Sequence, residues 1–227
     1  MSPEQKDLMQ IIWSSGKLLE YNIQSQLSQM QIEKNNAEIN YVQSSRPELT
    51  EIIKDVLKPF HISIKERNIS TQVNGHASIP ISFFIEKKIY CEILFNLFQN
   101  AVKFNKNCGS IVTSVRYEKE TGKLWTSVED TGAGINAKVR RSLFIAFRNA
   151  TNERLNQQSI FKSGVGTGLS NSKCLVEALG GTIDLQSKPN KGTIVTFSVD
   201  LVLGKEKEMP AFSVLKSKVA FKDDDSD

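Results

Sequence analysis

Cysteine and histidine are scarce in this sequence of 227 residues, which contains three cysteines and two histidines. The cysteines, Cys91, Cys108 and Cys174, form no CxxC pair, so the sequence predicts neither a disulfide framework nor a zinc site. His61 and His76 lie far apart along the chain, which argues against a histidine-rich metal site. The low cysteine content favours a reducing, cytoplasmic setting.

Long apolar runs and a strong excess of one charge are also missing. The longest unbroken apolar run has five residues, 143–147, whereas a membrane-spanning helix needs roughly 20. The 29 basic and 25 acidic residues leave a net charge of +4, too small to indicate nucleic-acid binding. With 39% hydrophobic and 24% charged residues, the composition is typical of a globular protein with a full core. We therefore expect neither nucleic-acid binding nor membrane contact from this segment.

The first segment, residues 2 to about 33, is predicted to form one long helix. Ser2 and Gln5 fit a capping box, and Pro3 suits the first turn. Apolar residues recur three, four or seven positions apart along it, at Leu8, Ile12, Leu19, Ile23, Leu27 and Met30. Such a stripe needs a partner surface, so the segment is either an ordinary core helix or one half of a helical hairpin or dimer stem.

The remaining chain mixes helices with adjacent pairs of strands. Strands are predicted at 37–43, 69–73, 110–118, 123–130, 182–186 and 192–203. Helices are predicted from a capping box at Ser45 and Glu48 to Phe60, at 83–105, from after Gly134 to Phe147, and at 167–179. Residues 148–166 read as a long polar loop, and the charged tail from 204 is predicted to be disordered. Adjacent strand pairs favour an α+β, two-layer sandwich over a doubly wound parallel sheet.

Three segments carry residues suited to binding a nucleotide. The first is a polar stripe on the helix 83–105, formed by Glu92, Asn96, Asn100 and Lys103. A carboxylate, two amides and an ammonium in line can hold hydrated magnesium and the phosphates that it neutralises. The alternative is an ordinary solvated helix face.

The other two segments are glycine-rich. In 130–135, DTGAGI, the glycines allow close approach of the backbone to a ligand, and the strand-end Asp130 can accept from an adenine amino group. In 164–169, GVGTGL, three glycines open a helix whose N-terminus suits phosphate. This is neither a Walker loop nor a dinucleotide fingerprint. A simple glycine turn and a flexible hinge are the alternatives.

The order of these segments resembles the GHKL ATPase superfamily, and within it the catalytic ATP-binding domain of sensor histidine kinases. Residues 95–105, FNLFQNAVKFN, resemble the N box, and 129–135, EDTGAGI, resemble the first glycine box. Residues 143–147, LFIAF, are similar to the phenylalanine box, and 164–183 to the second glycine box with its helix. The resemblance covers about 34–203, and the helix before it is similar to the second helix of a dimerisation stem.

The resemblance implies a Bergerat fold, a mixed sheet with helices on one face, and a site for Mg-ATP. It makes Asn100 the magnesium ligand, Lys103 a phosphate contact and Asp130 the adenine acceptor. Asn96 stands where hydrolytic members carry a water-activating glutamate, so slow hydrolysis and transfer to another acceptor are expected. The remaining nucleotide contacts would be Gly132, Gly134, Ile135, Phe147, Gly164, Gly166, Thr167, Gly168 and Leu169.

The sequence departs from the family in three places. Thr167 replaces an apolar residue and Ala146 replaces a proline, and neither His61 nor His76 lies in a phosphoacceptor box. We therefore predict a stem helix at 1–33, a catalytic ATP-binding domain at 34–203 and a tail at 204–227.

The expected function is transfer of the γ-phosphoryl group to a histidine supplied by a partner stem helix, in a homodimer or a longer kinase. A response-regulator receiver domain would accept the phosphoryl group next, in a two-component phosphorelay. The setting would be cytoplasmic, or the soluble part of a membrane-attached sensor. One alternative is a non-catalytic, ATP-gated interaction module. Another is an aspartic protease, but its paired carboxylates need two DTGA loops, and the chain has one.

Overall fold

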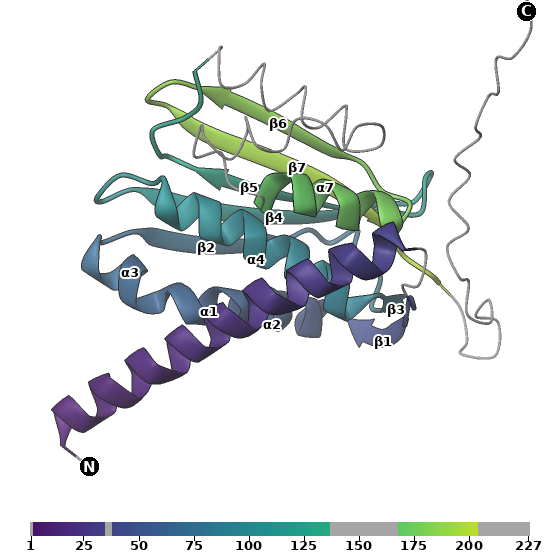
Figure 1. Cartoon of the computed structure of the whole chain (residues 1–227). Coiled ribbons are helices and arrows are strands. Elements are labelled where there is room, and N and C mark those ends of the chain that lie inside the picture. Colours follow the sequence, from purple (N-terminus) through teal and green to yellow (C-terminus); the bar gives the residue numbers. More distant parts are fainter. Residues whose placement is uncertain (1, 35–37, 137–167, 204–227) are drawn as a thin grey trace, which may run out of the picture.

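A five-stranded mixed sheet is the base of the fold in the computed structural model, which describes residues 2–34, 38–136 and 168–203 (Figure 1). Its strand order is β2 (Ser70–Gly75), β4 (Ser110–Glu118), β5 (Lys123–Asp130), β7 (Gly192–Asp200) and β6 (Ile183–Lys188). Strands β2 and β4 are parallel, and the other neighbours are antiparallel.

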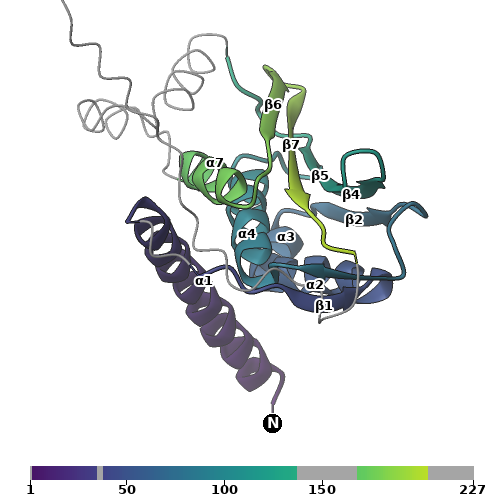
Figure 2. The same ribbon diagram turned by 90° about the vertical axis from the view of Figure 1, so that its right-hand side faces the viewer.

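Helices cover one face of this sheet, and among the described residues no helix covers the other face, which is called the open face below (Figure 2). The central helix is α4 (Lys87–Lys103), with α7 (Gly168–Ala178) on one side and α2 (Arg46–Leu57) on the other. Side chains of α4 fill the space above the sheet, where Ile93, Leu94 and Phe98 are fully buried beside Leu124 and Phe197. The predicted α+β, two-layer architecture is therefore confirmed.

A small second sheet was not predicted. Strand β1 (Val42–Ser45) pairs antiparallel with β3 (Ser82–Ile85). The prediction that a helix starts at Phe83 was therefore wrong, and α4 starts four residues later. The segment 83–85 is a short, continuous apolar run, and periodicity cannot separate a buried strand from a buried helix in such a run.

The segment around α2 also differs from the prediction. The capping box at Ser45 and Glu48 was wrong, because Ser45 belongs to β1 and makes no side-chain cap hydrogen bond. After α2 the chain tightens into a 3₁₀ turn, η1 (Lys58–Phe60), and continues as the unpredicted helix α3 (His61–Glu66). Pro59 lacks an N–H, which explains the interruption between α2 and α3.

The long N-terminal helix α1 (Pro3–Glu33) forms as predicted, with both hydrogen bonds of the Ser2–Gln5 capping box present. Its apolar stripe, however, is not part of the core. The six residues of the stripe, which are Leu8, Ile12, Leu19, Ile23, Leu27 and Met30, are 48–61% exposed. The interpretation of α1 as an ordinary core helix is therefore wrong. Within the described residues, none of the helices, α1 included, is both long and apolar enough to span a bilayer.

Glu86, at the start of α4, gives the fold a predicted pH dependence. This buried carboxylate caps the helix by accepting from Ile89 N–H. Burial raises its pKa from 4.5 to about 7, and nearby Glu92 adds to the rise. The folded protein therefore holds this proton more tightly than the unfolded chain. Its contribution to the free energy of unfolding is complete below pH 4.5 and is lost as pH rises through about 7.

The free energy of unfolding should therefore fall with rising pH because of Glu86, by at most about 3 kcal/mol between pH 4.5 and 8. We expect Glu86→Gln to remove this slope. Urea unfolding across that range measures it. Glu48, an exposed glutamate in the first turn of α2, supplies the control Glu48→Gln, which should keep the wild-type slope. An unchanged slope in Glu86→Gln would contradict the assignment.

Candidate functional site

Helix α4 carries the predicted polar stripe, which is only partly solvated. Glu92 and Asn96 are 1% and 4% exposed, Asn100 is half-buried and Lys103 is exposed at the end of the helix. The interpretation of the stripe as a solvated helix face is therefore wrong for its first two members. Lys103 lies over the Phe104 ring, with Nζ 5.1 Å from the centroid, where its ammonium group stays accessible.

The start of α7 meets this stripe. A Cβ atom added to Gly168 would lie 3.8 Å from Asn100 Nδ2 and 3.9 Å from Asn96 Oδ1. Residues about 70 positions apart in the sequence are thus neighbours, and the N-terminus of α7 lies beside both amides. Backbone N–H groups at a helix N-terminus and the positive end of the helix dipole favour an anion. Leu169, by contrast, is 7% exposed and packs in the hydrophobic core.

The glycine turn after β5 is joined to the C-terminal end of α4, one turn beyond Asn100. Phe104 O, at the C-cap of α4, accepts from Ala133 N (3.0 Å), and Asn105 Oδ1 accepts from Thr131 Oγ1 (3.3 Å). Asp130 is half-buried at the strand end, and its Oδ1 accepts from Gly132 N (2.8 Å). Burial raises the pKa of Asp130, and the N–H groups of Gly132 and Thr193 partly oppose this rise.

Close backbone packing explains the two glycines of this turn. A Cβ atom at Gly132 would lie 2.2 Å from Phe104 O, and one at Gly134 would lie 2.0 Å from Lys188 O. Gly134 also has φ +64°, a conformation that glycine adopts without strain. The next residue, Ile135, donates its N–H to Ser187 Oγ (2.8 Å). The turn is therefore held against α4 on one side and the β6–β7 hairpin on the other.

Sequence reasoning missed two groups around α4. Arg67 donates to the carbonyls of Val102 (Nη1–O, 2.5 Å) and Asn105. It thereby gives hydrogen-bond partners to carbonyl groups at the C-terminal end of the helix. On α1, Ser25 accepts from the side-chain amides of Asn96 (3.0 Å) and Asn171. Serines at 14, 25 and 28 share one face of α1, and this spacing was a signal available in the sequence.

The structure thus brings together most of the described candidate residues around α4. Asn96, Asn100 and Gly168 meet beside α7, and Asp130, Gly132 and Gly134 meet at the C-terminal end of α4. Four predicted positions, Phe147, Gly164, Gly166 and Thr167, lie outside the described residues, and so do the predicted short helix before Phe147 and the tail.

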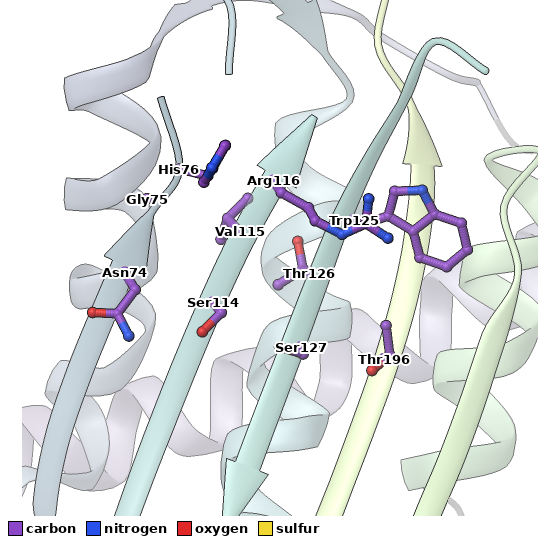
Figure 3. Close-up of a pocket in the computed structure, with 10 residues that line it drawn as sticks. All are labelled: Asn74, Gly75, His76, Ser114, Val115, Arg116, Trp125, Thr126, Ser127 and Thr196. Carbon is purple, nitrogen blue, oxygen red and sulfur yellow. The ribbon is translucent and has the colours of Figure 1, made fainter. Parts of the chain in front are cut away.

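A separate shallow pocket of about 330 Å³ lies on the open face of the sheet (Figure 3). Its lining includes His76, Arg116 and Trp125 and none of the predicted site residues. The Arg116 guanidinium lies 5.4 Å from the Trp125 ring centroid, and both side chains bond Glu118, at 3.5 Å and 3.1 Å. These three side chains therefore contact one another on the sheet surface. The pocket is distinct from the candidate site because it lies on the opposite face of the sheet and shares none of its residues.

Comparison with known proteins identifies the family of this chain. The family model for histidine kinase-, DNA gyrase B-, and HSP90-like ATPases matches residues 86–203, just over half of the chain. The chain therefore belongs to this family of ATP-binding domains. The matched region begins at the cap of α4 and ends after β7, and so contains every described candidate residue.

The relatives of this chain are sensor kinases. It is 40% identical over 120 residues to the sensor protein GacS of Pseudomonas syringae, covering 52% of this chain and 12% of GacS. It is 27% identical over 192 residues to the sensor protein RprX of Bacteroides fragilis, covering 85% and 36%. It is 31% identical over 186 residues to the circadian histidine kinase CikA of Synechocystis, covering 82% and 24%. The chain thus spans between 12% and 36% of the length of these relatives.

Solved histidine kinases share the fold. The Acinetobacter baumannii histidine kinase AdeS has a TM-score of 0.59 at 16% identity, over 81% of this chain and 79% of that one. Full-length ShkA in complex with AMPPNP has a TM-score of 0.61 at 20% identity, over 95% and 41%. The catalytic domain of ThkA has a TM-score of 0.54 at 20% identity, over 71% and 97%.

Proposed function

We propose that this chain is the ATP-binding catalytic core of a sensor histidine kinase. It would transfer the γ-phosphoryl group of Mg-ATP to a histidine on another helix or chain, in a two-component phosphorelay. The main support is the meeting of Asn96 and Asn100 with Gly168, which joins an oxygen-bearing helix face to a helix N-terminus. In the transfer, a histidine nitrogen forms a bond to the γ-phosphorus while the bond to the β-phosphate oxygen breaks, and ADP leaves.

The groups present fit a magnesium nucleotide. An amide oxygen suits magnesium, which keeps several waters and needs few protein ligands. Asn100 would hold the ion, and bound magnesium would neutralise phosphate charge. Lys103, exposed at the end of α4, would contact phosphate, with Asn96 and Gly168 beside it. Positioning and charge neutralisation supply most of the catalysis in phosphoryl transfer.

The base end of the nucleotide would lie at the glycine turn. Asp130 would accept from the adenine amino group, and Gly132, Gly134 and Ile135 would line the base pocket. The half-buried Asp130 carboxylate is oriented by Gly132 N–H, which supports this role. Leu169 is buried in the hydrophobic core, so it would pack behind the site. The predicted contacts of Phe147, Gly164, Gly166 and Thr167 remain part of the proposal on sequence resemblance alone.

A partner stem helix would supply the acceptor histidine. The chain's own α1 contains no histidine. The six residues of its apolar stripe are 48–61% exposed, as expected of a helix that pairs with another helix. We propose residues 1–33 as the second helix of such a stem, 34–203 as the catalytic domain and 204–227 as a tail. A response-regulator receiver domain would then take the phosphoryl group from the histidine.

Isothermal titration with ATP, with magnesium and with EDTA, tests the proposal through Asn100→Ala. We expect the wild type to bind more tightly with magnesium, and the variant to bind equally in both conditions because its metal ligand is gone. Asn100 is half-buried on the polar stripe, so its truncation leaves the hydrophobic core intact. Asn107→Ala, at an exposed position beyond α4, is the control and should keep the magnesium effect.

Two results would contradict this assignment. A wild-type chain that binds no ATP would refute the proposed function. Loss of helical circular dichroism in Asn100→Ala, together with loss of binding in EDTA, would make Asn100 a structural residue.

A further inference from the structure

A buried hydrogen-bond network joins the C-terminal end of α4 to the glycine turn after β5. Its centre is Asn105, which lies two residues beyond α4 and is 6% exposed. Asn105 Oδ1 accepts from Thr131 Oγ1 (3.3 Å) and from Lys106 N (3.0 Å), and Asn105 Nδ2 donates to Ser110 O (3.1 Å). Both polar atoms of this amide are therefore paired within the protein.

Thr131 completes the network from the side of the turn. Its Oγ1 donates to Asn105 and accepts from Ser110 N (2.8 Å), and its backbone N–H donates to Ser110 O (3.2 Å). A threonine hydroxyl can donate one proton and also accept, and here it does both. Because Thr131 directly follows Asp130, the network ends one residue from the proposed adenine acceptor.

Two neighbouring residues are matched to this network. A Cβ atom at Gly109 would lie 2.3 Å from Asn105 Oδ1 and 2.8 Å from Thr131 Oγ1, so a residue without a side chain leaves room for their hydrogen bond. Arg67 donates to the carbonyls of Asn105 and Val102, and thereby holds the backbone that carries the amide. The contact is thus enclosed by the protein and is not an incidental surface contact.

The network connects the two ends of the proposed nucleotide site. Asn105 comes five residues after Asn100, the proposed magnesium ligand on α4, and Thr131 is next to Asp130 at the end of β5. These ends belong to separate segments of the chain, so their spacing depends on contacts between α4 and the turn. ATP must reach both ends at once, and hydrogen bonds weaken steeply when donor and acceptor are misaligned.

We infer that Asn105 and Thr131 are positioning residues, which hold the Asp130 carboxylate at the place relative to Asn100 that ATP requires and so set the preference for adenine. This inference rests on the proposed ATP-binding function and adds two residues that determine its base specificity. The polar side-chain atoms of both residues are engaged within the protein, so they act through the backbone of the turn and not by touching the nucleotide.

Thr131→Val tests the inference, with Thr131→Ser and Thr126→Val as matched variants. Valine has nearly the shape of threonine but no hydroxyl, so it removes the bond to Asn105, whereas serine can keep it. Thr126 lies on β5 and bonds Tyr90 OH in the core (2.9 Å), so Thr126→Val removes a buried hydrogen bond away from the turn. Isothermal titration with ATP, with and without magnesium, and competition by GTP measure binding, and urea unfolding measures stability.

We expect Thr131→Val to weaken ATP binding roughly three- to tenfold, because a displaced Asp130 loses part of its hydrogen bond to adenine. GTP binding should not change, so the preference for ATP over GTP falls by the same factor. The magnesium effect should remain, because Asn100 is on α4. Thr131→Ser should match the wild type. Thr126→Val should lose stability yet keep the wild-type preference, which separates positioning from a general loss of structure.

An unchanged preference for ATP in folded Thr131→Val would overturn the inference and leave the proposed function standing. An equal loss of ATP and GTP affinity in that variant would do the same, since it would indicate a general structural effect. A wild-type chain that binds no ATP would overturn the proposed function, and the inference with it.

Gly109→Ala provides the test if Thr131→Val fails to fold. The added methyl group would force Asn105 Oδ1 and Thr131 Oγ1 apart, so the preference for ATP should fall as in Thr131→Val. Gly16→Ala is the control, because Gly16 is exposed on α1 and a Cβ atom there meets nothing within 4 Å. Wild-type preference in Gly109→Ala would overturn the inference.

Discussion

Asp130→Asn is expected to weaken ATP binding by roughly 10- to 150-fold. The proposed contact is a hydrogen bond from the adenine amino group to a charged carboxylate, and such bonds contribute about 1.5–3 kcal/mol. Asparagine replaces one carboxylate oxygen with an NH₂ donor, which faces the adenine amino group with the wrong polarity. Isothermal titration with ATP measures the loss. For the same reason, GTP should compete poorly with ATP in the wild type, since guanine carries a carbonyl where adenine carries the amino group.

We expect this substitution to leave the fold intact. Asparagine keeps one acceptor oxygen, which can take the Gly132 N–H that Asp130 Oδ1 accepts now. Glu129→Gln is a matched control, because Glu129 is the exposed neighbour on the same strand and loses the same charge. We expect the control to bind ATP within about twofold of the wild type. Unchanged ATP affinity in Asp130→Asn would show that this aspartate does not recognise adenine.

The chain incubated alone with γ-labelled ATP should gain no acid-labile phosphate, whereas an added stem domain with an acceptor histidine should become labelled. The only histidines are His61 and His76, and neither is on α1. His76 lines the pocket on the open face of the sheet, opposite α4 and the proposed site (Figure 3). Water is a poor substitute acceptor, because the amide of Asn96 is a weak base.

Phosphate mapping separates the possible outcomes of this labelling experiment. Label on the chain itself, lost in His61→Ala or His76→Ala, would identify that histidine as an unconventional acceptor and contradict the prediction. Label on the stem alone would agree with it. A chain that binds ATP yet labels none of several stems would favour the ATP-gated interaction module over the kinase.

Local sequence signals predicted much of the sheet and the glycine turn. Alternating side chains marked β4 and β5 at the observed bounds, because their register depends on a period of two that is readable within one strand. Gly132 and Gly134 were chosen because glycine lets the backbone approach a ligand, whereas the structure gives both another reason, since a Cβ atom there would clash with a backbone carbonyl of the protein itself. Where a short apolar run lacked any period, as in 83–85, the same reasoning mistook a strand for a helix.

The sequence by itself determined that α1 is a helix with one apolar stripe and one row of serines, because both follow from a period of 3.6 residues. Only the tertiary structure decided which of these faces meets the domain. Helix docking depends on side chains far apart in the chain, such as Ser25 with Asn96 and Asn171, and no local pattern encodes those distances. The hydrophobic effect has no direction, so a stripe predicts that a surface will be covered but not by which partner.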